Sequence, residues 1–297
     1  MNGTAKAIIL VMTCFTLAMS GTNVKDRIPS KPVKIVTYKT IDKIKLRMHI
    51  FVPENHDPKI KSSAIIFFFG GGWSSGTPKQ FYQQCRYLAS RGMVAMSAEY
   101  RVKSRHGTSP FECVKDAKSA IRWVRTHAGK LGVDPNKIVS GGGSAGGHIA
   151  ACTAMIENME NKGEDLSISS KPNALVLFNP VLGLTENDKN ADKITERIRK
   201  ILPADHVKEG LPPFIIFHGA EDTTVPVAAI EIFQKLMNNK GNRCEVVPFK
   251  GRKHGFFNYG RNNNEPFNKT MELTDKFLTS RGFLKKADGR RDGDGKE

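Results

Sequence analysis

Hydrophobic and polar positions follow two different periodic patterns along the chain. Residues 33–40 (VKIVTYKT) and 44–52 (IKLRMHIFV) alternate between apolar and polar positions, which predicts an antiparallel pair of strands. After a proline-containing break, residues 63–69 (SAIIFFF) form a continuous apolar run, which is typical of a strand buried on both faces. The folded part of the chain is therefore expected to begin with strands.

Beyond this run, helical spacing and short apolar runs alternate as far as residue 281. The helical segments are 78–90, 110–128, 145–160, 226–240 and 265–281, with a more polar helical stretch at 186–201. The strand-like runs are 93–98, 137–141, 173–178, 214–218 and 243–249. Strands separated by helix-length segments predict a single α/β domain, with a mostly parallel central sheet of about eight strands and helices on both faces.

The first twenty residues have a pattern of their own. Lys6 precedes the almost entirely apolar residues 7–17, and Ala18 and Ser20 then place small side chains where signal peptidase reads them. This pattern predicts a cleavable signal peptide over residues 1–20, and hence export to the periplasm or the exterior. The apolar run is shorter than the roughly 20 residues that a bilayer-spanning helix needs, so no stable membrane insertion is expected after cleavage.

Composition excludes several classes of protein and indicates where the folded domain begins and ends. Of the 297 residues, 39% are hydrophobic and 25% are charged, which excludes wholesale disorder, a collagen helix and a coiled coil. We expect a linker over 21–32, the α/β domain over 33–284 and a disordered charged tail over 285–297. The net charge of +17 predicts attraction to polyanions. Because that charge is spread along the chain and no nucleic-acid module is recognised, nucleic acid is not an expected partner.

Cysteine usage is consistent with export but does not require disulfides. An even number of cysteines follows the leader: Cys85, Cys113, Cys152 and Cys244. Cys85 and Cys113 fall on successive predicted helices and are the candidate disulfide pair, whereas Cys152 lies among small apolar residues that are typical of a buried thiol. Inside the leader, Cys14 lacks the small preceding residues that lipid attachment prefers, so a lipoprotein is the weaker alternative.

The first candidate for chemistry is a serine in a glycine-rich turn. The predicted strand 137–141 runs directly into Gly-Gly-Ser-Ala-Gly (142–146), and a helix is predicted to follow. In this position a G-x-S-x-G sequence holds its serine in a strained, exposed turn, with the positive end of the helix pointing at it. Ser144 is therefore the expected nucleophile. The competing interpretation, a phosphate-binding loop, lacks the usual Gly-Lys-Ser/Thr ending and G-x-G-x-x-G opening.

A serine nucleophile needs a base, and four histidines follow Ser144. His148 lies one helical turn beyond the serine, and His206 lies in a polar connection. His218 ends a strand that no acid precedes, so we expect it to brace a turn. His254 stands in Gly-Arg-Lys-His-Gly, a loop beyond the last predicted strand, which is where the base of this fold belongs. The alternative for His254 is a surface histidine in a basic loop.

The imidazole in turn needs an acid to orient it and to stabilise its charged form. Asp222 lies in HGAEDTTVP, just past strand 214–218 and 32 residues before His254. That gap holds one helix and one strand, so both side chains should emerge at the same edge of the sheet. Glu221 is the neighbouring competitor, and we favour Asp222 because the following Thr-Thr-Val-Pro resembles the usual surroundings of the acid.

The last requirement is a set of donors for the negative charge that develops on the attacked carbonyl oxygen. Three glycines and a tryptophan follow the strand 63–69, and glycine lets the backbone approach a ligand closely. We expect the N–H groups of Gly71, Gly72 and Ala145 to form this oxyanion hole. Trp73 is expected either to wall the substrate pocket or to pack as an ordinary aromatic residue.

Together these segments give the chain a family resemblance over residues 33–281. It resembles the α/β-hydrolase superfamily, and most of all the carboxylesterases that include hormone-sensitive-lipase-like enzymes and secreted bacterial esterases acting on acylated plant polysaccharides. The motifs that carry this are FFFGGGW, SAEYR (97–101), GVDPNKI (132–138), GGGSAGGH, HGAEDTTVP and KHGFF. One departure is Phe69, which stands where the hormone-sensitive-lipase pattern has a histidine that braces the loop.

The resemblance implies a secreted serine carboxylesterase acting on acetyl or hydroxycinnamoyl esters of polysaccharides, or on small soluble esters. This chemistry needs no cofactor and no metal. The lid region between Phe178 and Pro212 is short and polar, which argues against a lipase that opens at an oil surface. Two alternatives stay open: an amide hydrolase such as a formamidase, which would use the same residues, and a catalytically silent binding protein on the same fold.

Overall fold

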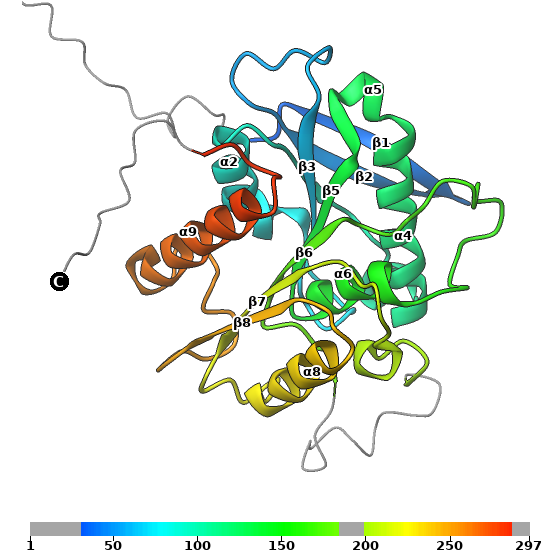
Figure 1. Cartoon of the computed structure of the whole chain (residues 1–297). Coiled ribbons are helices and arrows are strands. Elements are labelled where there is room, and N and C mark those ends of the chain that lie inside the picture. The colour runs from blue at the N-terminus through cyan, green and yellow to red at the C-terminus, as the bar shows by residue number, and fades with distance from the viewer. Residues whose placement is uncertain (1–30, 184–198, 287–297) are drawn as a thin grey trace, which may run out of the picture.

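An eight-stranded sheet forms the centre of the molecule (Figure 1). The computed structural model describes residues 31–183 and 199–286. The strands are β1 (Lys34–Ile41), β2 (Ile44–Phe51), β3 (Ser62–Phe68), β4 (Val94–Ala98), β5 (Val133–Gly143), β6 (Ala174–Phe178), β7 (Phe214–Gly219) and β8 (Cys244–Phe249). They lie in the order β1-β2-β4-β3-β5-β6-β7-β8. β2 is antiparallel to both of its neighbours, and every other pair is parallel, which confirms the predicted fold class.

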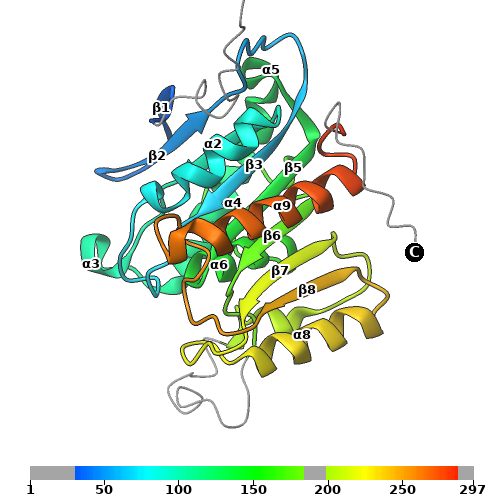
Figure 2. The same ribbon diagram turned by 90° about the vertical axis from the view of Figure 1, so that its left-hand side faces the viewer.

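Helices cover both faces of this sheet (Figure 2). The longer ones are α2 (Tyr82–Ser90), α4 (Pro110–Thr126), α6 (Ala145–Met155), α8 (Val227–Asn239) and α9 (Glu265–Ser280). The short ones are η1 (Pro78–Phe81), α3 (Lys103–His106), α5 (Ala128–Leu131), η3 (Pro203–His206) and η4 (Asn262–Asn264). α2 and α9 lie together on one face, whereas α4, α6 and α8 lie on the other, so the central parallel strands are buried on both sides.

Aromatic side chains fill the middle of the core. Phe67 of β3 stacks on Phe81 with 4.7 Å between ring centroids, and Phe178 of β6 lies 5.9 Å from Phe81. Phe257 lies 4.8 Å from Phe178 and also stacks against Phe81. The apolar run predicted as a doubly buried strand is therefore fully buried, and it anchors the loop that follows it to the site described below.

The largest boundary error concerns α6. The helix was expected to reach residue 160, but Ile156 already adopts an extended conformation (φ −92°, ψ 121°). The carbonyl of Ile156 accepts a hydrogen bond from Lys118 Nζ over 2.8 Å instead of continuing the helix. Two residues later, Asn158 lies in the left-handed region (φ 56°). A lysine from a neighbouring helix is a tertiary partner that periodicity does not reveal.

Several expectations fall outside the described residues. They are the signal peptide and most of the linker, the greater part of the helical stretch 186–201 and most of the charged tail. Within residues 31–183 and 199–286, no helix is long and apolar enough to cross a bilayer. The disulfide expectation does not hold: Cys85 and Cys113 are both buried free thiols, as are Cys152 and Cys244. Burial raises the pKa of Cys113 to about 12, so that thiol stays protonated at neutral pH.

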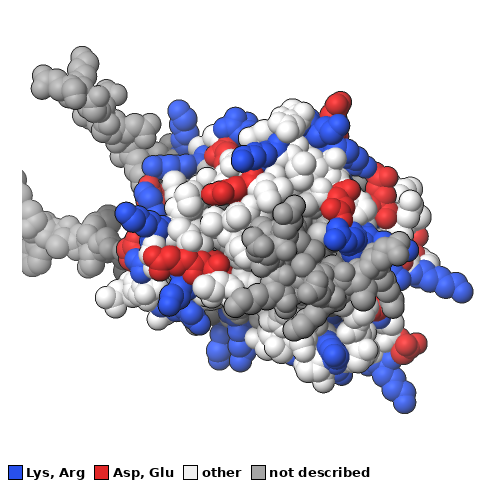
Figure 3. Space-filling view, turned by 90° about the horizontal axis from the view of Figure 1, so that it is seen from below, with Lys and Arg blue, Asp and Glu red and all other residues white. Residues whose placement is uncertain are grey.

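Charged side chains are spread over the surface. On the face drawn in Figure 3, lysines and arginines lie around the perimeter with acidic side chains among them. Among the described residues, acidic and basic side chains also form ion pairs, as Glu99 does with Arg47 over 3.0 Å. This distribution agrees with the scatter of charge along the sequence.

Candidate active site

Ser144 occupies the sharp turn between β5 and α6. Its backbone angles, φ 54° and ψ −123°, lie in a region that L-residues rarely adopt. Neighbouring glycines are required there, because a Cβ on Gly142 would lie 2.4 Å from the Gly146 carbonyl oxygen. A Cβ on Gly146 would lie 2.1 Å from the carbonyl oxygen of Phe68. The strained turn predicted from the G-x-S-x-G sequence is thus present, and close packing against β3 holds it.

Three side chains from different strand ends meet at this turn. Ser144 Oγ lies 3.0 Å from His254 Nε2, and His254 Nδ1 donates to Asp222 Oδ2 over 2.7 Å. Asp222 follows β7 and His254 follows β8, and these neighbouring parallel strands deliver both side chains to one edge of the sheet. The structure therefore brings together the three residues that the sequence analysis selected.

Asp222 is held as an anion. It is buried, and its Oδ1 accepts the N–H groups of Thr224 over 2.9 Å and Val225 over 3.0 Å. Burial by itself raises the pKa of Asp222, but the hydrogen bonds from His254 and from these two peptides outweigh it and hold the pKa below its ordinary value. Glu221, the competing acid, is exposed. The ionised carboxylate keeps a proton on His254 Nδ1, which leaves Nε2 to accept from the serine.

Two of the other histidines, His218 and His206, lie outside the triad. His218 Nε2 donates to the carbonyl of Val225 over 2.9 Å and lies 3.6 Å from Asp222 Oδ2, so it braces the turn that carries the acid, as expected. Burial lowers the pKa of His218. His206 ends the short helix η3, in the connection between β6 and β7.

The glycine-rich loop after β3 lies against the serine turn. A Cβ on Gly70 would lie only 3.4 Å from Ser144 Cβ. Gly71 (φ 127°) and Gly72 (φ 60°) are exposed, and Ala145 is the first residue of α6. Among the hydrogen bonds formed between described residues, none uses the N–H of Gly71, Gly72 or Ala145. These three expected donors therefore have no hydrogen-bond acceptor among the described residues.

The loop is braced without a histidine before its glycines. The ring of Phe69 stacks on Tyr100 with 4.2 Å between centroids, and the Tyr100 hydroxyl donates to the Phe69 carbonyl over 2.6 Å. On the next peptide, the N–H of Gly70 donates to Gln80 Oε1 over 2.6 Å. Two side chains from elsewhere in the chain thus hold the backbone where the loop leaves the strand.

Trp73 is anchored next to the serine turn. Its Nε1 donates to His148 Nδ1 over 3.2 Å, and the two rings meet edge to face. His148 Nε2 donates to the Ile201 carbonyl over 2.8 Å, and burial lowers the pKa of His148 to about 4, so this imidazole is neutral at physiological pH. His148 lies one helical turn from Ser144, and its backbone N–H donates to the Ser144 carbonyl. It packs beside the serine and is not the base that accepts the serine proton. Trp73 is therefore a half-buried, hydrogen-bonded aromatic residue at the rim of the site.

Two asparagines at the site were not predicted from the sequence. Asn179 is buried directly after β6; its Oδ1 accepts the N–H of Gly255 over 3.0 Å, and its Nδ2 lies 3.4 Å from His254 Nε2. Asn258 Nδ2 donates to the Gly255 carbonyl over 2.8 Å. The sequence could have indicated Asn179, because it follows a buried strand at the same edge as the other site residues. No sequence feature indicated Asn258.

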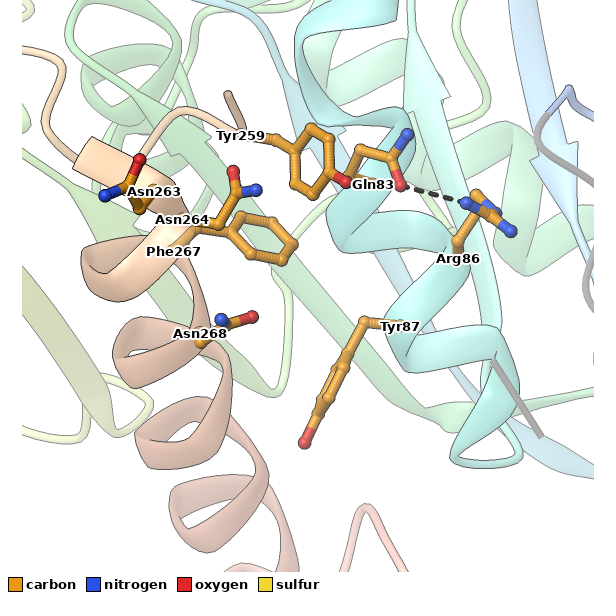
Figure 4. A pocket seen from close by; sticks show the side chains of 8 residues that line it. All are labelled: Gln83, Arg86, Tyr87, Tyr259, Asn263, Asn264, Phe267 and Asn268. Atoms are coloured by element: carbon orange, nitrogen blue, oxygen red, sulfur yellow. Dashed lines mark hydrogen bonds between the residues drawn. The ribbon is translucent and has the colours of Figure 1, made fainter. Parts of the chain in front are cut away.

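Two cavities lie near the His254 loop. The larger, about 340 Å³, opens between α2 and the start of α9 and is lined by Gln83, Tyr259 and Phe267 among others (Figure 4). None of the triad residues borders it, so it belongs to the flank of the domain. The smaller, about 250 Å³, borders His254 and Phe256 directly. Neither Ser144 nor the Gly70–Gly72 loop lines this smaller cavity, so neither cavity marks the path of a substrate to the serine.

The chain is similar in sequence to known esterases. The family model named BD-FAE matches residues 48–192. A probable isoprenylcysteine alpha-carbonyl methylesterase of Arabidopsis thaliana is 29% identical over 238 residues, which are 72% of this chain and 49% of that protein. The acetylxylan esterase of Xylanibacter ruminicola is 27% identical over 241 residues, which are 76% of this chain and 47% of that protein. The chain spans about half the length of the curated relatives it matches.

Solved structures give a more complete match. Thermogutta terrifontis esterase 2 phosphoramylated by tabun is 52% identical, with a TM-score of 0.82, and the match covers 86% of this chain and 96% of that chain. The butyrate-bound form of the same esterase is 50% identical, with a TM-score of 0.82 and coverage of 87% and 97%. A propionate-bound form matches equally well. Similarity over nearly the whole of a neighbour extends from the fold to the family.

Proposed function

Because the chain belongs to the carboxylesterases of the α/β-hydrolase family, we propose that it hydrolyses short-chain acyl esters through an acyl-enzyme on Ser144. The observation that carries this proposal is the continuous hydrogen-bonded series from Ser144 Oγ through His254 to the buried Asp222 carboxylate. Such a series turns a weak serine nucleophile into a strong one, because the imidazole accepts its proton as the new bond forms.

In the acylation step, Ser144 Oγ attacks the ester carbonyl carbon while its proton moves to His254 Nε2. The charge that develops on the carbonyl oxygen is met by the N–H groups of Gly71, Gly72 and Ala145. The tetrahedral intermediate then breaks its bond to the alcohol oxygen, which takes the proton from His254 Nε2. The products of this step are the free alcohol and an ester between the acyl group and Ser144.

Deacylation repeats the same steps with water as the nucleophile. A water molecule gives a proton to His254 Nε2 as its oxygen attacks the acyl carbon, and the same three N–H groups meet the new oxyanion. Collapse of this second intermediate returns the proton to Ser144 Oγ and releases the carboxylic acid. Asp222 remains ionised throughout and stabilises the imidazolium that forms in each half of the reaction.

The acyl group is proposed to be small. The similar Thermogutta terrifontis esterase 2 has been solved with propionate and with butyrate bound, which supports chains of this length. Trp73, held by His148, is proposed to wall the acyl pocket. The acetylxylan esterase relative supports acylated carbohydrate as the alcohol side. The leader-like residues 1–20 support export to a compartment where such polymers occur.

A panel of p-nitrophenyl esters from acetate to decanoate, together with acetylated xylan and feruloylated sugar, tests this proposal. We expect kcat/KM to be highest from acetyl to butyryl and to fall for longer chains, and we expect acetate release from the acetylated polymer. A preference for chains of ten carbons or more would reject the small pocket. Absence of turnover on every ester, with specific binding of one of them, would instead favour a silent binding protein.

A further inference from the structure

Two amide side chains connect the oxyanion loop (residues 70–72) to the base loop, which carries His254 and Gly255. Gln80 Oε1 accepts the N–H of Gly70 over 2.6 Å, and Gln80 Nε2 donates to Asn258 Oδ1 over 3.0 Å. Asn258 Nδ2 in turn donates to the carbonyl of Gly255, the residue after His254, over 2.8 Å. Three consecutive hydrogen bonds therefore span the distance between the two loops that flank Ser144.

The ends of this connection lie at the reacting centre. Gly70 precedes two of the three expected oxyanion donors, Gly71 and Gly72, and a Cβ added to it would lie 3.4 Å from Ser144 Cβ. At the other end, the peptide of Gly255 is held from both sides, since its N–H donates to Asn179 Oδ1 over 3.0 Å while its carbonyl accepts from Asn258. A shift at either loop would change the distance between the oxyanion donors and the imidazole.

We propose that Gln80 and Asn258 are positioning residues that lock the Gly70–Gly72 loop and the His254 loop to each other, so that oxyanion donors and base keep one geometry around Ser144. The proposal rests on the proposed function for the roles of those two loops. It also gives the loop a brace in a chain whose Phe69 supplies no polar side chain at the position where the hormone-sensitive-lipase pattern has a histidine.

The connection uses both hydrogen-bonding ends of each amide. Each of the two side chains uses its oxygen as an acceptor at one end and its NH₂ as a donor at the other. A carboxylate at position 80 could accept from Gly70 but could not donate to Asn258, and a methionine could do neither. Both side chains are only half-buried, so their loss does not empty the hydrophobic core.

Three variants of the full chain test the proposal: Gln80→Met, Asn258→Leu and the double variant. For each single variant we expect kcat to fall by about 10- to 100-fold with KM little changed, because small misplacements of catalytic groups cost rates of this order. The inhibition constant of a trifluoromethyl ketone, which forms a tetrahedral adduct on serine, should rise by the same factor as kcat/KM falls. If the two residues act as a unit, the double variant should lose no more activity than the worse single one.

A matched control lies three residues further along the chain, in the first turn of α2. Gln83 is half-buried like Gln80, but its Oε1 accepts from Arg86 at the rim of the flank cavity rather than from the oxyanion loop (Figure 4). Gln83→Met should keep kcat and the inhibition constant within twofold of the unchanged enzyme. Gln80→Glu, which preserves the bond to Gly70, should lose less activity than Gln80→Met, and it supplies the test if the methionine variant does not fold.

Amide hydrogen exchange gives a second readout that does not depend on turnover. In Gln80→Met, peptides covering 69–76 and 253–259 should both exchange faster, while peptides from β5 and α8 should not change. The proposal is overturned if kcat and the inhibition constant stay within twofold of the unchanged enzyme, if the losses in the double variant multiply, or if only one loop gains exchange. Failure of the proposed function would look different, since the unchanged protein would then hydrolyse no ester while the exchange experiment still decides the connection.

Discussion

Ser144 sits in a backbone conformation that costs folding energy, and such a residue persists only where the surrounding structure over-determines it. Here the close approach of Gly142 and Gly146 to their neighbours supplies that constraint. As a result, the hydroxyl of Ser144, the residue just before α6, lies 3.0 Å from His254 Nε2. The chemistry proposed for the site therefore depends on one atom, which makes it directly testable.

Ser144→Ala should abolish hydrolysis while the protein stays folded. Loss of the nucleophile in a triad that acts as a unit costs roughly 10⁶ in kcat. Alanine fills no new space, so circular dichroism and the melting temperature should resemble those of the unchanged protein. The assay is p-nitrophenyl acetate hydrolysis on purified variant, and activity near the original level would end the serine-esterase proposal.

Asp222→Asn should leave KM nearly unchanged and slow turnover by about 10⁴, because a neutral amide no longer keeps the proton on His254 Nδ1 or stabilises the imidazolium. Glu221→Gln is the matched control, since Glu221 is exposed and adjacent in sequence. That variant should keep full activity in the same steady-state assay. A severe loss in Glu221→Gln together with a mild one in Asp222→Asn would reassign the acid.

At the level of elements, two helical glycines differ in what surrounds them. Gly146 lies in the first turn of α6 against β3, where an added Cβ would lie 2.1 Å from the Phe68 carbonyl oxygen and 2.4 Å from that of Phe69. Gly129 lies in α5 with no atom within 4 Å of such a Cβ. Helix propensity alone favours alanine at both positions by up to about 1 kcal/mol. Packing between elements must decide the outcome.

Gly146→Ala should therefore lower the free energy of unfolding by about 1–3 kcal/mol, the usual cost of overpacking against rigid backbone. Gly129→Ala should leave it unchanged or raise it by up to about 1 kcal/mol. Urea unfolding followed by circular dichroism measures both values. Equal effects in the two variants would show that the serine turn yields to accommodate a side chain, contrary to the contacts described above.

On the scale of the whole molecule, buried neutral histidines link stability to pH. Burial lowers the folded-state pKa of His148 to about 4, and it lowers that of His218 as well. Between the ordinary pKa near 6.5 and the folded value, the unfolded chain binds a proton that the folded protein does not. Acidification through this window must therefore favour unfolding.

The free energy of unfolding should fall as pH drops from about 6.5 to about 4, with a slope of up to about 1.4 kcal/mol per pH unit for each such histidine. Urea titrations at several pH values measure this slope. His148→Gln retains an NH₂ group that can donate to the Ile201 carbonyl but does not titrate, so it should reduce the slope. A slope that this variant leaves unchanged would show that His148 is protonated in the folded protein.

Much of this molecule could be predicted because its information is local. The alternation of apolar runs and helical spacing follows from burial, which each segment expresses by itself, and it yields the strands, the longer helices and the fold class. Ser144, Asp222 and His254 each lie in a short segment just beyond a strand, and parallel strands bring their carboxyl ends to one edge. Motif and strand order together were therefore sufficient to bring these three residues to one site.

Only the tertiary structure decided which distant side chains meet. Gln80 and Asn258 are 178 residues apart, and Trp73 and His148 are 75 apart, yet each pair shares a hydrogen bond. The early end of α6 at Met155 has the same kind of cause, as does the separation of Cys85 and Cys113 into two free thiols. Periodicity along a chain encodes which face of an element is buried. It does not encode the partner across the interface, because that depends on how the elements pack in three dimensions.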